Sequence, residues 1–140
     1  MKIKSKSFGP VYVKMDPDGN LEFGEYVEKI SQDPPDISSP AVSLLYSLGS
    51  CIALSLQIVA KSKKVKLQPF HVKVSSEKAT NLPSRFGAFT ISISNDLIED
   101  RLQAQQILEK AKSICTVSNT LNADINVVLM DESFVVSTAI

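Results

Sequence analysis

The chain has 140 residues, 44% of them hydrophobic and 21% charged, which is enough for one domain that buries a core without disulfide bonds. Its 15 basic and 15 acidic residues give a net charge of zero, so no overall positive potential attracts nucleic acid or an anionic membrane surface. The N-terminus lacks the apolar run of a signal peptide, and we expect a cytoplasmic protein. In a reducing cytosol, two cysteines indicate packing, metal binding or redox chemistry.

The N-terminal region, residues 2–27, predicts a β-hairpin. Val11 and Val13 alternate with polar residues before the segment DPDGN, and Leu21 and Phe23 alternate after it. The proline, aspartate and glycine of this segment are typical turn residues.

A long helix is predicted from Pro40 to about Lys61. Ser39 has the character of an N-cap, and proline favours the first helical position. Apolar residues form a stripe and also lie outside it, so we expect this helix to be central and mostly buried. The lysine-rich segment KSKKVK follows, and we favour its interaction with the negative helix end over a binding patch.

The second half of the chain continues with strands at 69–78 and 88–94 and an amphipathic helix at 99–114. A short helical segment from about Thr116 and apolar strands at 125–130 and 134–136 complete the chain. Strands, helix, strands, helix and strand in this order predict a single α+β domain spanning residues 1–140.

Several candidate sites are weak. His71 shares a strand face with polar residues, which is typical of a solvated histidine rather than a catalytic one. Gly19 and Gly24 have the spacing of a phosphate loop, but Glu25 follows where that loop requires lysine. Two cysteines far apart and one histidine do not predict a metal site, and we expect no cofactor.

The two cysteines are stronger candidates. Ser43, Ser47, Cys51 and Ser55 recur every four residues, which indicates either a polar groove beside the thiol or small residues that permit close packing. Cys115 is either the last core-facing residue of its helix or the first residue of a new helix, whose free N–H groups would stabilise a thiolate.

The segments LLYSLGSCIALSL and CTVSNTL together resemble the two cysteine motifs of the OsmC/Ohr (osmotically inducible protein C / organic hydroperoxide resistance) family. The resemblance implies an OsmC-like fold, with antiparallel sheets around a long buried central helix, and an intertwined homodimer with sites at its interface. It also implies that Cys51 is the peroxidatic cysteine and Cys115 the resolving one. A hydroperoxide would be the substrate and a cellular dithiol the reductant. Thr116 stands where the family usually has proline.

The sequence departs from the family at the residues that activate the thiol. Ala41 replaces the glutamate that follows the helix-starting proline, and the first arginine in the chain is Arg85, well after Cys51. Lys14, or another lysine of the hairpin region, is a candidate replacement for the family's arginine, with Glu22 or Glu25 as its partner. A lysine ammonium does not reproduce the geometry of a guanidinium.

Two functions therefore come from the resemblance. The first is an antioxidant thiol peroxidase that reduces organic hydroperoxides through a Cys51–Cys115 disulfide. The alternative is a non-catalytic OsmC-like protein that binds a small apolar ligand or acts as a redox-responsive partner, which the missing arginine and glutamate would suit. Both cysteines of the motif pair are present, which favours the peroxidase.

Overall fold

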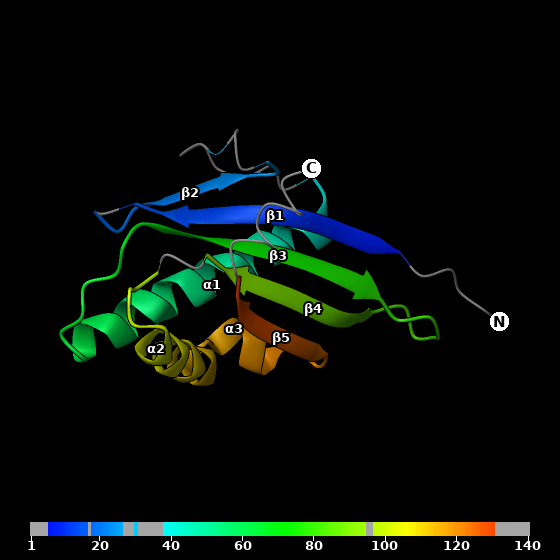
Figure 1. The fold of residues 1–140 in the computed structure, drawn as a ribbon. Coiled ribbons are helices and arrows are strands. Elements are labelled where there is room, and N and C mark those ends of the chain that lie inside the picture. Colours follow the sequence, from blue (N-terminus) through cyan, green and yellow to red (C-terminus); the bar gives the residue numbers. More distant parts are fainter. Residues whose placement is uncertain (1–5, 17, 27–29, 31–37, 95–96, 131–140) are drawn as a thin grey trace.

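The computed structural model describes residues 6–16, 18–26, 30, 38–94 and 97–130, which form one sheet with helices on one of its faces (Figure 1). The strands lie in the order β2-β1-β3-β4-β5. The elements along the chain are β1 (Ser7–Met15), β2 (Leu21–Gly24), α1 (Pro40–Ser62), β3 (Phe70–Lys78), β4 (Phe86–Ile93), α2 (Arg101–Ile114), α3 (Thr116–Thr120) and β5 (Asp124–Leu129). The predicted α+β class is confirmed, whereas the predicted strand at 134–136 lies outside the described residues.

The predicted N-terminal hairpin is present as β1 and β2, which pair antiparallel. Asp16 begins the turn, and its Oδ1 accepts hydrogen bonds from the backbone N–H groups of Asp18 at 2.9 Å and Asn20 at 2.8 Å. Val13 and Met15 are buried on the face of β1 that contacts α1. Because side chains alternate along a strand, Lys14 projects from the opposite, outer face of the sheet.

Helix α1 begins as its sequence predicts, with the Ser39 hydroxyl accepting a hydrogen bond from the Val42 N–H at 3.3 Å. The helix is long and apolar enough to cross a membrane by length and composition, but half of its most apolar stretch is buried inside the domain. Gly49 permits a close approach to the sheet, since a Cβ there would lie 2.9 Å from a methyl group of Val13 and 3.0 Å from one of Val74. The apolar character of α1 is thus explained by its packing on the sheet.

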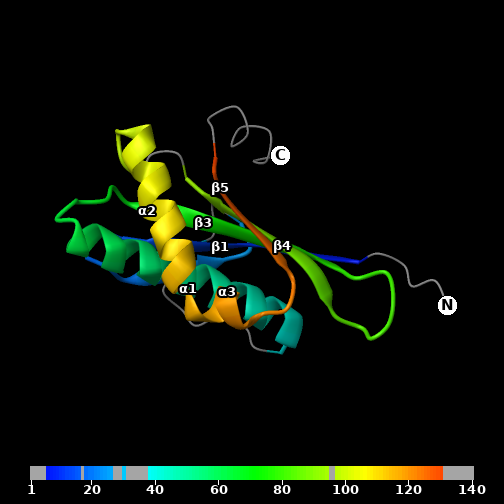
Figure 2. The same ribbon diagram turned by 90° about the horizontal axis from the view of Figure 1, so that it is seen from below.

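The expectation that α1 is mostly buried is only partly met within one chain. Its stripe of Leu45, Leu48, Ile52 and Leu56 is fully buried. The opposite side faces solvent, where Leu54 is 43% and Ile58 59% exposed. The sheet covers one side of α1, and among the described elements α2 and α3 are the helices that pack beside it (Figure 2).

The expectation of antiparallel sheets is wrong in two respects for the described residues, which form a single, mixed sheet. Strands β1 to β4 pair antiparallel, but β5 runs parallel to β4, with Phe89 opposite Ile125 and Ile91 opposite Val127. The physical reason is the connection, because α2 and α3 carry the chain back along the sheet before β5 begins. This crossover also places the residues between α2 and α3 against α1.

Candidate functional site at the two cysteines

Cys51 lies in the middle of α1, on the side that the sheet does not cover, and is half-buried. It lines an open hollow of about 440 Å³, which we call the Cys51 hollow. The other lining residues come from β2 and from the same side of α1: Phe23, Ser43, Tyr46, Ser47, Ser50 and Leu54. The lining is mostly apolar, and two members of the predicted small-residue stripe, Ser43 and Ser47, belong to it.

Cys115 joins α2 to α3, as the cap residue of both helices. Its extended backbone conformation, with φ −75° and ψ 102°, separates the two helices and turns the chain. The side chain is fully buried in the core, unlike that of Cys51. Both alternatives in the sequence are therefore realised, because Cys115 ends one helix facing the core and starts the next.

The fold makes the two free cysteines neighbours, close enough for Cys51 to affect the pKa of the Cys115 thiol. Burial raises the pKa of the Cys115 thiol, contact with Ser118 opposes this rise in part, and the neighbouring Cys51 adds to it. The expected stabilisation of a Cys115 thiolate by the start of α3 is thus outweighed by desolvation. Cys115 is held as a protonated thiol at neutral pH.

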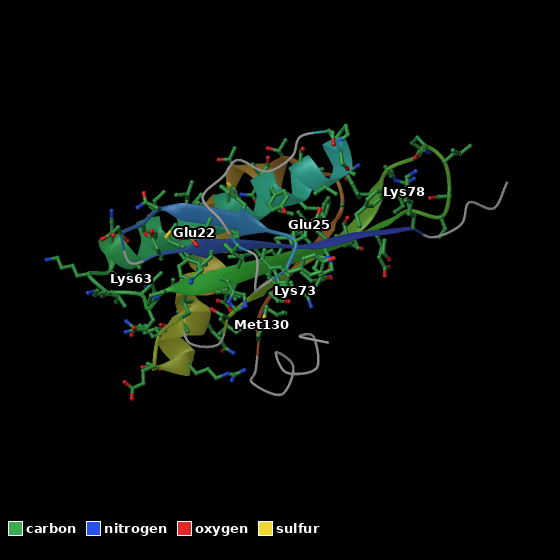
Figure 3. All side chains as sticks on the ribbon, turned by 90° about the horizontal axis from the view of Figure 1, so that it is seen from above. Glu22, Glu25, Lys63, Lys73, Lys78 and Met130 are labelled. Carbon is green, nitrogen blue, oxygen red and sulfur yellow. The ribbon has the colours of Figure 1, made fainter. Side chains whose placement is uncertain are left out.

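The structure does not bring the expected supporting residues to Cys51 within one chain. Lys14 pairs across strands with Glu22 and His71 on the outer face of the sheet, whereas α1 covers the inner face. Figure 3 shows Glu22 on β2 and Glu25 beyond the end of that strand. The proposed replacement of the family's arginine by Lys14 therefore lacks support from this geometry, because the sheet separates the two side chains.

Glu25 instead lies close to Tyr46, a residue that no motif in the sequence indicated. The Tyr46 ring packs edge-on against Phe23, with ring centroids 5.9 Å apart and an interplanar angle of 83°. Burial and the charge of Glu25 raise the pKa of Tyr46, so its hydroxyl remains a hydrogen-bond donor. Tyr46 is five positions before Cys51, and helical periodicity alone does not place it in the same hollow as the cysteine.

The Cys51 hollow lacks the electrostatic feature expected of an activated thiol. None of the described residues that line it carries a positive charge. The Ser43 hydroxyl is buried and has no hydrogen-bond partner among the described residues. The residues that the structure describes also contain no cluster of three histidine, cysteine, aspartate or glutamate side chains that could bind a metal ion. The chemistry that the site itself offers is that of two adjacent thiols, one accessible and one buried.

The sequence model of the OsmC-like protein family matches residues 34–130, which include both cysteines and the elements that hold them. The chain therefore belongs to the OsmC-like family. Comparison with curated protein sequences gave no match.

Solved structures share the fold over nearly the whole chain. The organic hydroperoxide resistance protein OsmC of Legionella pneumophila is 16% identical, with a TM-score of 0.59 over 94% of this chain and 97% of that one. The organic hydroperoxide resistance protein OhrB of Bacillus subtilis is also 16% identical, with a TM-score of 0.54 over 93% and 98%. An OsmC-like protein of Mycoplasma pneumoniae is 14% identical, with a TM-score of 0.56 over 94% and 99%. At these identities the similarity establishes the fold.

Proposed function

We propose that the protein is a cysteine-dependent peroxidase that reduces organic hydroperoxides through a Cys51–Cys115 disulfide. The observation that carries this proposal is that the fold makes neighbours of two free cysteines that are 64 positions apart in the sequence. Membership of the OsmC-like family supports it, as do structural neighbours named for organic hydroperoxide resistance.

The difference in burial assigns the two roles in this proposal. A hydroperoxide reaches Cys51 through the open hollow, whereas the fully buried Cys115 is shielded from it. The apolar lining formed by Phe23, Tyr46 and Leu54 suits the organic part of such a substrate. A buried thiol with a raised pKa reacts slowly with peroxide itself, yet it is positioned to attack an adjacent oxidised sulfur.

The proposed reaction has two steps. The Cys51 thiolate attacks the terminal oxygen of the hydroperoxide, the O–O bond breaks, and the alkoxide takes a proton and leaves as an alcohol. The Cys115 sulfur then attacks the Cys51 sulfenic acid, an S–S bond forms, and the hydroxyl leaves with the Cys115 proton as water. A cytoplasmic dithiol supplies two electrons to restore both thiols.

Turnover of an organic hydroperoxide with a dithiol reductant tests the proposal. Cys51→Ser should abolish turnover, whereas Cys115→Ser should stop after one equivalent and leave a sulfenic acid that dimedone traps. Ser62→Ala is the matched control, since Ser62 lies in the last turn of α1, where its hydroxyl donates to the Val59 carbonyl at 3.1 Å. Turnover that persists in Cys51→Ser would contradict the proposal.

The absence of positive charge among the described residues of the Cys51 hollow favours a second candidate function. In this alternative the protein is a non-catalytic OsmC-like protein, which binds a small apolar ligand or serves as a redox-responsive partner. The rate at which Cys51 reacts with peroxide separates the two functions. A rate no faster than that of free cysteine at the same pH would favour the second.

We propose a homodimer as the working unit. The support is the solvent-facing side of α1, where Leu54 borders the Cys51 hollow and the exposed Ile58 continues the apolar surface. A second copy would cover these side chains and enclose the hollow. Light scattering should report about twice the 15.3 kDa chain mass, and Ile58→Glu should shift the protein towards the monomer. A monomeric wild-type protein at micromolar concentration would contradict the homodimer.

A further inference from the structure

A second concave site lies at the C-terminal end of α1, beside the turn between β1 and β2 and the segment that leads into β3. It has a volume of about 420 Å³ and a mostly apolar lining, and we call it the lysine-rimmed pocket. Its lining residues are Met15, Asp16, Gln57, Ala60, Lys61, Lys64, Val65, Lys66, Leu67, Gln68 and Phe70. None of them lines the Cys51 hollow, so the two sites are separate.

The charge of this pocket is positive. Lys61, Lys64 and Lys66 contribute three ammonium groups, and all three residues are exposed at its rim. Asp16 is the only acidic residue among the described lining residues, and its carboxylate already accepts two backbone hydrogen bonds within the β1–β2 turn. An anionic group entering the pocket therefore meets three cations and a carboxylate that is already hydrogen-bonded.

Interaction with the helix end does not account for all of these lysines. The last carbonyl groups of α1 accept hydrogen bonds from backbone N–H groups, since Lys64 N–H donates to the Lys61 carbonyl at 3.1 Å and Val65 N–H to the Ala60 carbonyl at 2.9 Å. Lys64 has a φ of 58°, a left-handed conformation in which glycine is the residue usually found after a helix. Lysine is therefore not the residue that this backbone conformation favours, and its side chain adds a positive charge to the pocket lining.

We propose that the lysine-rimmed pocket binds a small amphiphilic carboxylate. Its apolar chain lies against Val65, Leu67 and Phe70, and its anionic head lies between the ammonium groups of Lys61 and Lys64. The pocket has the size and the largely apolar surface of typical small-molecule sites, and its polar side chains can orient the ligand. The proposal is independent of cysteine chemistry, because no lining residue is shared with the Cys51 hollow.

Isothermal titration calorimetry with decanoate, below its micelle-forming concentration, tests this proposal. The wild-type protein should bind decanoate saturably, and it should bind acetate and decyltrimethylammonium much more weakly. Lys64→Gly should weaken binding about two- to fivefold, the size expected for one partly exposed charge pair. The double variant Lys61→Ala/Lys64→Gly should weaken it on the order of tenfold.

Two features of the chain make the test decisive. Lys64→Gly relieves the left-handed backbone, so its melting temperature should equal or exceed that of the wild type while its affinity falls. Lys63→Ala is the matched control. Lys63, labelled in Figure 3, caps the same helix but is not among the residues that line the pocket. No saturable decanoate binding, equal binding of the cationic amphiphile, or equal weakening by Lys63→Ala would each overturn the proposal.

Discussion

Oxidation of Cys51 and Cys115 to an intramolecular disulfide should stabilise the protein substantially. The two residues are 64 positions apart, so the bond would close a long loop in the unfolded chain. Restricting a loop of this length raises the free energy of unfolding by about 4 kcal/mol in the chain-entropy model. The gain arises in the unfolded state, whose conformational freedom the bond removes.

The geometry of the folded state determines how much of this increase in the free energy of unfolding should be observed. The two cysteines are already neighbours in the reduced protein, and α1 packs against α3, so we expect disulfide formation to need little rearrangement of these helices. We therefore expect a net increase of about 2–4 kcal/mol, since native-state strain commonly reduces the entropic value. For a chain of this length the melting temperature should rise by roughly 10 °C.

The assay is urea denaturation followed by circular dichroism, on reduced protein and on protein treated with one equivalent of hydroperoxide. Mass spectrometry without reductant should show a chain two hydrogens lighter and no covalent dimer. Cys51→Ser and Cys115→Ser are matched controls, and oxidation should give neither of them the intramolecular gain. A disulfide that forms within the chain yet leaves the midpoint unchanged or lower would refute the reasoning that the folded state already positions both sulfurs.

Three further predictions concern the elements that hold the site. Gly49→Ala should lower the free energy of unfolding by about 1 kcal/mol. Crowding of the Val13 and Val74 methyl groups should outweigh the better helix propensity of alanine. A higher urea midpoint for the variant would contradict this. Asp100→Ala should cost about 1 kcal/mol, since its carboxylate caps α2 through two backbone N–H groups at 3.0 and 3.2 Å; an unchanged midpoint would exclude that role. Burial raises the pKa of Cys115 above the ordinary thiol value of 9.0, so the folded state retains this proton more tightly than the unfolded state does. Stability of the reduced protein should therefore fall as pH rises above 9.0, and Cys115→Ala should show a weaker decline when both are unfolded by urea at a series of pH values.

Local sequence signals determined most of the secondary structure of this protein. Ser39 and Pro40 start α1 where capping chemistry places the start, and Asp100 starts α2 in the same way. These boundaries are predictable because an N-cap satisfies backbone donors within a few residues of itself. The two cysteine motifs also sufficed to indicate the OsmC-like family, which the match over residues 34–130 confirms.

Tertiary structure decided which of these residues meet. Strand alternation showed that Lys14 and Val13 lie on opposite faces of β1, but only the packing of α1 on the Val13 face separated Lys14 from Cys51. The parallel direction of β5 likewise depends on the path of α2 and α3 across the sheet. Short-range sequence patterns do not predict such contacts, because the contacts join segments that are far apart in the chain.

The state of the two thiols depends on the same long-range packing. Local sequence signals place Cys51 within a helix and Cys115 at the end of one. Their exposure and their proximity to each other follow from the way α3 packs on α1. Desolvation then outweighs the helix-start effect that the sequence suggested for Cys115. A pKa depends on every group that surrounds the sulfur, and only the folded chain brings those groups together.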